Sequence, residues 1–427
     1  MNLTFVGAGF VGLVTAAVFA DLGNDVWVVE IDQEKIKKLK KGKAPFYEPN
    51  LERLIAKNIK AGRLNFTSCY QEAVPGAEVT FVCVGTPNKN GEIELGFLYS
   101  ATKSIAKNLK KPAILAIKST IPPGINGKID KWMRRFTKIK FSLVSLPEFL
   151  AEGRAIEDTL HPYRVVIGTK DRKAAKKLLQ LHQEISGERL ICDPSSAQLI
   201  KFAANTFLPT KISFANALAV LCDKFGADVK KVMEGLGMDK RIGPDFLGAG
   251  IGYGGSCFPK DVDALINLAQ KAGYDFDLIK ATQKINQSQI DYFLKKAVRL
   301  CGGSVKGKKV VVLGLSFKPE TSDLREARSI YVIKGLKKRG AKVIVCDPVA
   351  VPEAKRILKG VRFSADPYQA LKGADALLLI TEWKQYQNLD FDKIKKLMRH
   401  PVVVDGRNIY NRKRLEKLGF TYEGIGQ

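Results

Sequence analysis

The sequence predicts an α/β protein in which two doubly wound domains are joined by a helical middle segment with a long central helix. Three observations lead to this fold class. Strand-like and helix-like segments alternate along the first part of the chain, helical patterns fill the middle, and a second alternation follows. Such alternation is typical of parallel sheets covered by crossover helices. We expect the domains to span 1–194, 195–300 and 301–427.

The expected strands are short, almost entirely apolar and rich in β-branched residues, as strands buried on both faces are. In the first domain they cover 3–7, 25–30, 79–85, 113–119, 141–145 and 164–169. The last domain repeats the pattern with strands at 308–314, 341–348, 374–381 and 401–406, and with a helix over 326–339 that Gly340 ends.

A long helix opens the middle segment. Ser195 and Gln198 have the spacing of a capping box, which predicts the helix start, and helical periodicity continues to about Phe225. Pro209 lacks a backbone N–H, so we expect a kink within this helix. Further helical patterns continue to about residue 300.

Composition restricts the class of protein. The chain of 427 residues is 45% hydrophobic and has no apolar stretch long enough to span a bilayer. Its first expected strand starts close to Met1, which leaves no room for a signal peptide. The seven cysteines include no CxxC pair, which argues against disulfides and against a zinc site. We therefore expect a cytoplasmic protein with no metal site.

The net charge of +27 raises nucleic-acid binding as an alternative, because basic surfaces attract polyanions. The basic residues are nevertheless spread over segments such as 36–43, 172–177, 334–340 and 411–417, where most lie at helical spacing among apolar residues. That pattern indicates the solvated faces of surface helices. The same charge would steer an anionic substrate toward the protein.

A glycine-rich turn, GAGFVG at 7–12, follows the first strand, and Glu30 ends the second. Glycines allow the tight turn and let a pyrophosphate approach a helix N-terminus, while a carboxylate at position 30 binds the ribose 2′-hydroxyl and repels a 2′-phosphate. The pattern predicts a Rossmann-like, NAD-binding first domain. The expected contacts are Gly7, Gly9, Phe10, Val11, Gly12 and Glu30. The last domain is also Rossmann-like but lacks this turn, which favours a nucleotide-linked substrate there.

A second motif, GIGYGGSCFPKD, covers 250–261. Its closely spaced glycines exclude a core helix or strand and indicate a loop made for close backbone approach. Cys257 precedes a predicted helix whose first turn suits Pro259. We expect this helix N-terminus and the nearby Lys260 to lower the pKa of the thiol. The other six cysteines lie in apolar runs, so we expect them to be buried. Cys257 is the candidate nucleophile.

This loop, preceded by RIGP at 241–244, resembles the active-site segment of the UDP-glucose/GDP-mannose dehydrogenase family. Further family-like stretches follow in the same order: GAGFVG (7–12), APFYEPNL (44–51), CVGTP (83–87), KSTIPPG (118–124), PEFLAEG (147–153), KFAANTF (201–207), FKPETSDLRE (317–326) and DGRN (405–408). Within the family, residues 241–261 are most similar to members that oxidise UDP-glucose.

The resemblance implies a catalytic set. Cys257 is the nucleophile, and two residues four apart on one helix face stabilise negative charge on the reacting oxygen. Two acids and a threonine position or activate the hydrolytic water. The full set is Cys257, Lys201, Asn205, Asp261, Thr120 and Glu148.

The resemblance also implies binding residues. Lys35, Thr86, Thr120 and Arg325 join the cofactor side. Phe246 packs on uracil, and Arg241 reaches the substrate from a neighbouring subunit, which implies a homo-oligomer of at least two chains. The substrate set is Glu148, Phe149, Leu150, Ala151, Glu152, Lys201, Asn205, Arg241, Phe246, Tyr253, Gly254, Phe317, Lys318 and Arg407.

The implied activity is the NAD-dependent, four-electron oxidation of UDP-glucose to UDP-glucuronate. The aldehyde is held on Cys257 as a thiohemiacetal, which a second oxidation converts to a thioester that water cleaves. The alternatives are oxidation of UDP-N-acetylmannosamine or GDP-mannose, a basic nucleic-acid-binding protein, and a catalytically silent nucleotide-sugar sensor.

Overall fold

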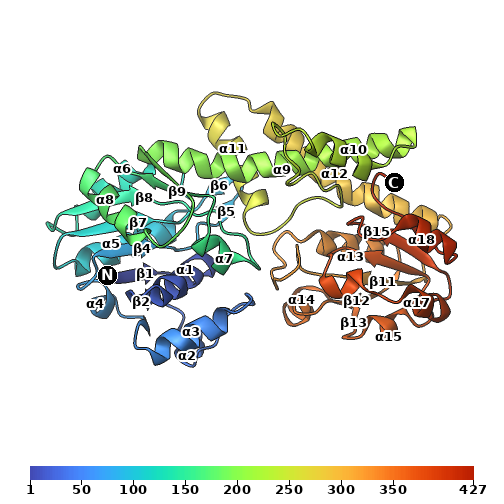
Figure 1. Cartoon of the computed structure of the whole chain (residues 1–427), viewed down its shortest axis with the longest axis horizontal. Helices are drawn as coiled ribbons and strands as arrows, with labels where there is room; N and C mark the ends of the chain where they lie inside the picture. Colours follow the sequence, from blue (N-terminus) through green and yellow to red (C-terminus); the bar gives the residue numbers. More distant parts are fainter. The chain divides into compact units, whose positions relative to one another are not determined.

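Figure 1 shows the whole chain, residues 1–427, as a computed structural model. By its contacts the chain divides into two compact units, Met1–Ala204 and Asn205–Gln427, each with its own sheet. The α/β fold class is confirmed, with largely parallel, doubly wound sheets and a long central helix.

The first unit contains an eight-stranded sheet. In spatial order its strands are β10 (Glu188–Cys192), β9 (Arg164–Gly168), β8 (Phe141–Ser145), β7 (Ala113–Ile117), β4 (Val79–Val82), β1 (Asn2–Val6), β2 (Asp25–Val29) and β3 (Leu64–Thr67). From β8 to β3 the strands are all parallel, in the order of the dinucleotide-binding fold. The expectation of a parallel sheet is wrong for β9, which pairs antiparallel with β8 through Ser145 and Gly168.

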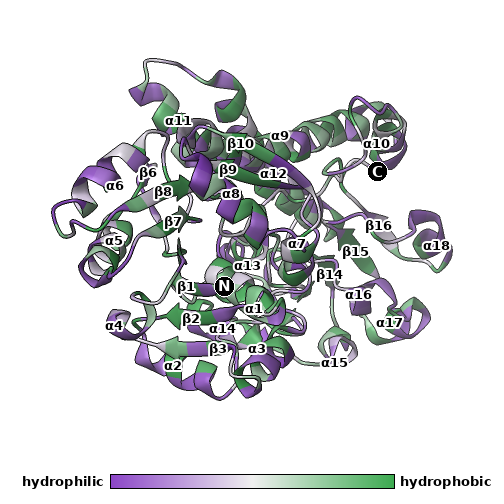
Figure 2. Cartoon of the chain, turned by 60° about the vertical axis from the view of Figure 1, so that its left-hand side comes forward, coloured by the Kyte–Doolittle hydropathy of each residue, from purple (hydrophilic) through white to green (hydrophobic).

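Helices cover both faces of this sheet. They are α1 (Phe10–Asp21), α2 (Gln33–Lys40), α3 (Leu51–Lys60), α4 (Tyr70–Ala73), α5 (Gly96–Asn108), α6 (Ile125–Met133), α7 (Ala155–Leu160) and α8 (Arg172–Leu181), with a small hairpin of β5 (Asn88–Lys89) and β6 (Glu92–Ile93). Successive strand residues enter separate cores: Phe5 stacks on Phe81 at 4.4 Å on the face that α1 covers, while Val6 lies in the core with residues of α5. Figure 2 shows hydrophobic strands and more hydrophilic outer helices such as α2.

The long helix α9 spans Pro194–Phe225. Its start differs from the prediction, because Asp193 accepts the N–H groups of Ser195 and Ser196 and so caps the helix. The capping-box interpretation of Ser195 and Gln198 is therefore wrong. The Gln198 amide is buried instead and donates to the side chains of Asn126 and Ser145, at 2.6 and 2.9 Å. The helix continues through Pro209 without interruption.

The second unit has a fully parallel six-stranded sheet. In spatial order its strands are β13 (Arg362–Phe363), β12 (Lys342–Cys346), β11 (Lys309–Leu313), β14 (Ala376–Leu379), β15 (Val402–Asp405) and β16 (Thr421–Glu423). By order along the chain this is the same 3-2-1-4-5-6 arrangement as the six parallel strands of the first unit. None of the helices is both long and apolar enough to cross a membrane.

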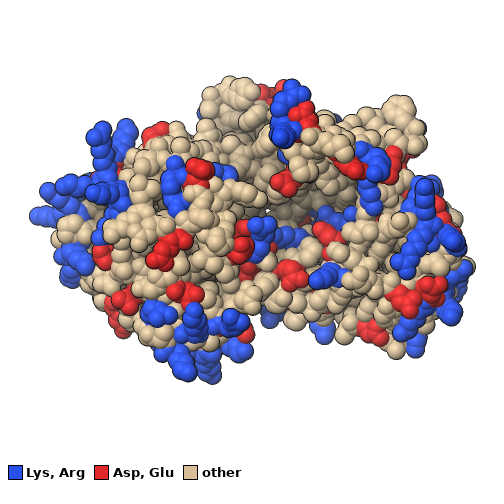
Figure 3. Space-filling model, viewed as in Figure 1, with Lys and Arg blue, Asp and Glu red and all other residues tan.

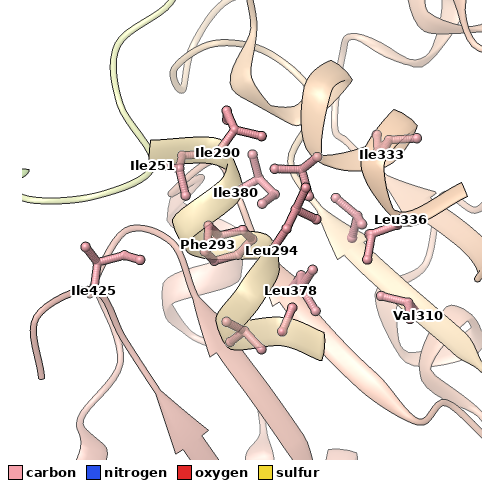
Figure 4. Close-up of a cluster of buried hydrophobic side chains, with 14 of the residues drawn as sticks. Ile251, Ile290, Phe293, Leu294, Val310, Ile333, Leu336, Leu378, Ile380 and Ile425 are labelled. Atoms are coloured by element: carbon pink, nitrogen blue, oxygen red, sulfur yellow. The ribbon is translucent and has the colours of Figure 1, made fainter. Parts of the chain in front are cut away.

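The helical middle segment shares a core with this second sheet. Its helices are α10 (Val229–Gly237), α11 (Phe258–Lys271) and α12 (Asp277–Leu300). Figure 4 shows Phe293 and Leu294 of α12 packed among side chains of the sheet and of α13 (Arg328–Lys338), including Leu378 and Ile333. The remaining helices are α14 (Val351–Ile357), α15 (Pro367–Leu371), α16 (Lys384–Gln387), α17 (Phe391–Leu397) and α18 (Arg412–Lys417).

Candidate active site

The glycine turn between β1 and α1 needs two of its glycines for close packing. Gly7 has a φ of +104°, and a Cβ there would lie 2.8 Å from the carbonyl oxygen of Cys83. A Cβ on Gly12 would lie 2.0 Å from the carbonyl oxygen of Gly7. Gly9 differs, because a Cβ there would meet nothing within 4 Å. The turn therefore packs tightly on one side and leaves the start of α1 open on the other.

Glu30 follows β2 and lies beside this turn. Its buried carboxylate accepts the N–H groups of Ala8, Ile31 and Asp32 at 3.2, 2.8 and 3.1 Å, and the Nζ of Lys35 lies 3.9 Å from it. The first N–H groups of a helix have no intrahelical partner and attract a pyrophosphate. An open helix start beside an acid that ends the second strand fits NAD. Thr86, also expected on the cofactor side, is buried after β4.

Glu148 and Lys201 form a buried ion pair. The Lys201 Nζ donates to Oε1 of Glu148 at 2.8 Å and to its carbonyl oxygen at 2.6 Å. Burial would raise the pKa of the Glu148 carboxyl, but the Lys201 ammonium, the N–H of Leu150 and the charge of Lys118 hold that pKa below its ordinary value. Glu148 is therefore ionised at neutral pH, as a general base must be.

Residues 148–155 form a loop that carboxylates hold by its backbone. Ala151 donates its N–H to Asp158 at 2.9 Å. The ring of Phe149 lies 3.9 Å from the Arg164 guanidinium and 5.5 Å from the Lys201 Nζ. Leu150, Ala151 and Glu152 are all partly exposed, so the expected substrate-binding loop presents side chains and backbone at the surface of its unit.

Thr120 lies near Lys201, another residue of the expected catalytic set. Both line a small pocket with Gln198 and Pro147. Lys118, two residues before Thr120, was not assigned a role from the sequence, yet its charge acts on both Glu148 and Lys201. Burial lowers the pKa of the Lys118 amine. The structure therefore places a second lysine beside the predicted site.

In the second unit, Asn205 and Asp261 are hydrogen bonded. The Asn205 Nδ2 donates to Oδ2 of Asp261 at 2.6 Å, and Lys260 pairs with Oδ1 of the same carboxylate at 2.5 Å. Asp261 lies in the first turn of α11, and its N–H donates to the Cys257 carbonyl. As predicted, Cys257 lies at the N-terminus of that helix, where it is the N-cap residue, and its Sγ lies 3.6 Å from the Ser256 hydroxyl.

The loop before Cys257 packs so closely that glycine is required at several positions. A Cβ on Gly252 would lie 2.3 Å from the Asn286 Oδ1, and one on Gly254 would lie 2.3 Å from the Glu326 carbonyl oxygen. The Asn286 amide bonds both the N–H and the carbonyl of Tyr253, at 2.8 and 3.1 Å. Residues far apart in sequence thus hold the nucleophile's loop in place.

The other expected substrate residues of the second unit fall into two groups. Phe246 (φ +63°) and Arg241 are exposed, and the Arg241 guanidinium pairs only locally, with Asp239 at 2.6 Å. Arg407 is instead held by the carbonyls of Ile380 and Phe317, at 2.7 and 3.3 Å.

Two further predicted site residues of the second unit are partly or largely exposed. Lys318 is partly exposed and lies over the Phe317 ring at 5.8 Å. Arg325, expected on the cofactor side, pairs with Asp323 at 2.6 Å.

The burial expected for the other cysteines is correct for four of them and wrong for two. Cys69 and Cys192 are only partly buried, because Cys192 ends the edge strand β10 and Cys69 precedes the short helix α4. None of the seven cysteines forms a disulfide. Cys69 and Cys257 are both partly buried N-cap residues, but α4 has only 4 residues whereas α11 has 14. Cys257 is therefore the partly exposed thiol at the start of a long helix, where a thiolate is favoured.

Comparison with known proteins gives three consecutive family matches. Residues 1–186, 195–288 and 311–412 match the NAD binding, central and UDP binding domains of the UDP-glucose/GDP-mannose dehydrogenase family. A UDP-glucose 6-dehydrogenase of Rhizobium meliloti (strain 1021) is 41% identical, with 100% of both chains covered.

Solved structures agree in fold along the whole chain. A UDP-glucose dehydrogenase from Pyrobaculum islandicum is 37% identical with a TM-score of 0.92, covering 99% of this chain and 97% of that one. A UDP-D-ManNAc dehydrogenase from Pyrococcus horikoshii is 28% identical with a TM-score of 0.89, covering 100% and 99%.

Proposed function

This chain belongs to the UDP-glucose/GDP-mannose dehydrogenase family, and we propose that it is the UDP-glucose 6-dehydrogenase, which oxidises UDP-glucose to UDP-glucuronate with two NAD. The observation that carries the substrate is the identity of 41% over both full lengths with an enzyme of that name. Cys257 at the N-terminus of α11 supports the chemistry, because a helix N-terminus favours the thiolate that a covalent mechanism needs.

The residues around Gly9 and Glu30 would hold the cofactor. Gly9 leaves room for the pyrophosphate at the start of α1, and Glu30 would accept the ribose hydroxyls. When bound, NAD accepts one hydride in each oxidation. Lys35, Thr86, Thr120 and, from the second unit, Arg325 are proposed to complete the cofactor side.

The first oxidation removes a hydride from C6 of the glucose and a proton from its hydroxyl, leaving an aldehyde. The Cys257 thiolate then adds to the aldehyde carbon, and a C–S bond forms as the carbonyl oxygen becomes an oxyanion. Lys201 and Asn205, one turn apart in α9, are proposed to stabilise this negative charge. Loss of the second hydride converts the thiohemiacetal to a thioester.

Water completes the reaction. It attacks the thioester carbon, the C–S bond breaks, and the Cys257 thiolate and the carboxylate of UDP-glucuronate are released. The water must lose a proton to a base, and Glu148 or Asp261 would accept it. The depressed pKa of Glu148 keeps it ionised for this step. The partly exposed 148–155 loop and Phe317, Lys318 and Arg407 are proposed to bind the nucleotide sugar.

We also propose that the protein is a homo-oligomer of at least two chains. Three large apolar side chains of α9 recur every seven residues, and Phe207, Phe214 and Leu221 are 63, 51 and 44% exposed. Exposed apolar side chains at this spacing on one helix face are typical of a helix that packs on a partner. The exposed Arg241 fits the proposed role of reaching a neighbouring subunit's substrate. We place the enzyme in the cytoplasm.

The deciding experiment measures NADH yield against a panel of nucleotide sugars. UDP-glucose should give two NADH per molecule and exceed UDP-galactose, GDP-mannose and UDP-N-acetylglucosamine in kcat/KM. UDP-N-acetylmannosamine is the competing substrate, because a dehydrogenase of that sugar has the same fold at 28% identity. A panel in which UDP-N-acetylmannosamine gives the highest kcat/KM would replace the proposed substrate.

The charge gives little support to nucleic-acid binding. On the face shown in Figure 3, Lys and Arg lie in several separate groups, with Asp and Glu between them. A sequence-specific nucleic-acid surface would present its cations as a patch or stripe. A catalytically silent sensor would have no need of the nucleophile and its surrounding acids.

A further inference from the structure

The Glu48 carboxylate makes an unassigned contact with the substrate loop. Glu48 lies in the segment that joins α2 to α3 and is 5% exposed. Its Oε2 accepts the Gly153 N–H at 2.6 Å, and its Oε1 accepts the Ala155 N–H at 2.7 Å. Both carboxylate oxygens are therefore used on one short stretch of backbone, 105 and 107 residues away in the chain.

A buried carboxylate is costly unless hydrogen bonds satisfy it, and bonds from N–H groups to an ionised acceptor are short and strong. The distances to Glu48 are in that range. Within the loop, Glu148 holds Leu150 and Asp158 holds Ala151, but both acids belong to the loop or to the helix that follows it. Glu148 connects the start of the loop to Lys201 of α9, and Glu48 is the distant acid that accepts backbone N–H groups at the other end of the loop.

The segment that carries Glu48 is itself anchored at the cofactor turn. The ring of Phe46 lies 5.3 Å from that of Phe10, the first residue of α1. The contact between Phe46 and Phe10 therefore holds the segment that carries Glu48 against the start of α1.

We propose that Glu48 is a positioning residue, which fixes the 148–155 loop for substrate binding by holding the backbone of Gly153 and Ala155. The loop carries Glu148 and the residues expected to contact the nucleotide sugar. A small displacement of such groups from their binding positions weakens substrate binding. This inference rests on the proposed function, since it names the loop's ligand as UDP-glucose. Glu48 touches neither reacting atom nor cofactor in this scheme.

The test compares Glu48→Gln with Glu52→Gln in the full-length enzyme. Both variants remove one carboxylate charge from the same region, but only Glu48 contacts the loop. Glu48→Gln should raise the KM for UDP-glucose roughly tenfold or more, with a smaller change in kcat and in the KM for NAD. Glu52→Gln should leave all three within about twofold of the parent. Glu48→Ala should raise the KM for UDP-glucose more than Glu48→Gln does, because the glutamine amide keeps one acceptor oxygen and alanine keeps none.

Hydrogen exchange gives a readout that does not need the substrate. The Gly153 and Ala155 amides should exchange at least about tenfold faster in Glu48→Gln than in the parent. A KM for UDP-glucose that stays within twofold of the parent overturns the proposal, as does a loss confined to kcat. If the parent itself does not oxidise UDP-glucose, the proposed function fails, and unchanged exchange in Glu48→Gln then overturns the positioning role independently.

Discussion

The Nζ of Lys201 lies 2.8 Å from Oε1 of Glu148, and both side chains are more than nine-tenths buried. One residue comes from the long helix α9 and the other from the loop after β8. The lysine thus sets the protonation state of the acid, and the acid compensates the buried ammonium. The two proposed roles, charge stabilisation and water activation, depend on each other through this pair.

Replacing Lys201 by Ala should slow both oxidations by roughly two to three orders of magnitude, the usual effect of losing one oxyanion stabiliser. Stopped-flow measurement of the two NADH phases would check this. Lys224→Ala, in the last turn of the same helix, is the control and should retain the parent rate. A variant at Lys201 that slows only one phase would restrict its role to that oxidation.

The pair should also make stability depend on pH. The folded-state pKa of Glu148 lies below its ordinary value of 4.5, so its contribution is present above that value and is lost as pH falls through the folded pKa. Glu148→Gln strands a buried ammonium and should lower the free energy of unfolding by roughly 3–5 kcal/mol at neutral pH. Thermal unfolding across pH should show this difference narrowing below about pH 4.5. A difference that stays constant with pH would contradict the assigned ion pair.

Glu30 should determine the choice of cofactor. Its carboxylate would repel the 2′-phosphate of NADP, so Glu30→Ala should lower the ratio of kcat/KM for NAD over NADP by roughly tenfold or more. Glu34→Ala, an exposed acid of α2 paired with Lys37, is the matched control. Equal use of both cofactors by the parent enzyme would refute the role given to Glu30.

Cys257 should be required for the second oxidation. Cys257→Ala removes the nucleophile and should block the second hydride transfer more than the first, which needs only a base. Cys257→Ser should collapse turnover, because an alkoxide is far harder to form than a thiolate and any ester hydrolyses slowly. Mass spectrometry after mixing the Ser variant with UDP-glucose and NAD would detect such an adduct.

The control for these variants is Cys192→Ser, a partly buried thiol at the end of an edge strand. It should keep the parent activity and the yield of two NADH. If Cys257→Ala makes UDP-glucuronate near the parent rate, the thiol is structural and the covalent mechanism is wrong.

Phe214 should lie in the interface between chains. A charge among the exposed apolar side chains of α9 would be buried on association, so Phe214→Glu should shift the protein to a smaller species in size-exclusion chromatography with light scattering. Tyr163→Glu, at an 83% exposed aromatic outside α9, should leave the mass unchanged. A parent protein that is monomeric at micromolar concentration would contradict the proposed homo-oligomer.

The sequence determined the fold class and the local parts of the candidate site. The glycine turn with Glu30 and the placement of Cys257 before α11 depend on motifs of a few residues, whose turn and helix-start chemistry is local. The interior strands could also be predicted from the sequence, because strands buried on both faces are continuous apolar runs. These features depend on short residue patterns that can be recognised without knowing how distant segments pack.

Tertiary structure alone decided the edges of both sheets. Besides the small hairpin of β5 and β6, the strands that the sequence did not predict are β3, β10, β13 and β16, which are the outermost strands of the two large sheets. An edge strand has only one strand neighbour and need not be apolar. In β10, for example, Glu188 is exposed and Arg189 is half-buried. Without a continuous apolar run, such strands do not differ from loops in sequence.

Contacts across long chain separations were likewise decided only by folding. Asp193, and not the predicted Ser195, caps α9. The Gln198 side chain, expected in the cap, instead bonds Asn126, 72 residues away. Glu48 holds Gly153 from 105 residues away, and its carboxylate resembles any loop acid in the sequence. Local patterns cannot encode such pairings, because a hydrogen bond depends on where two segments meet, and that position is fixed by the packing of the whole sheet.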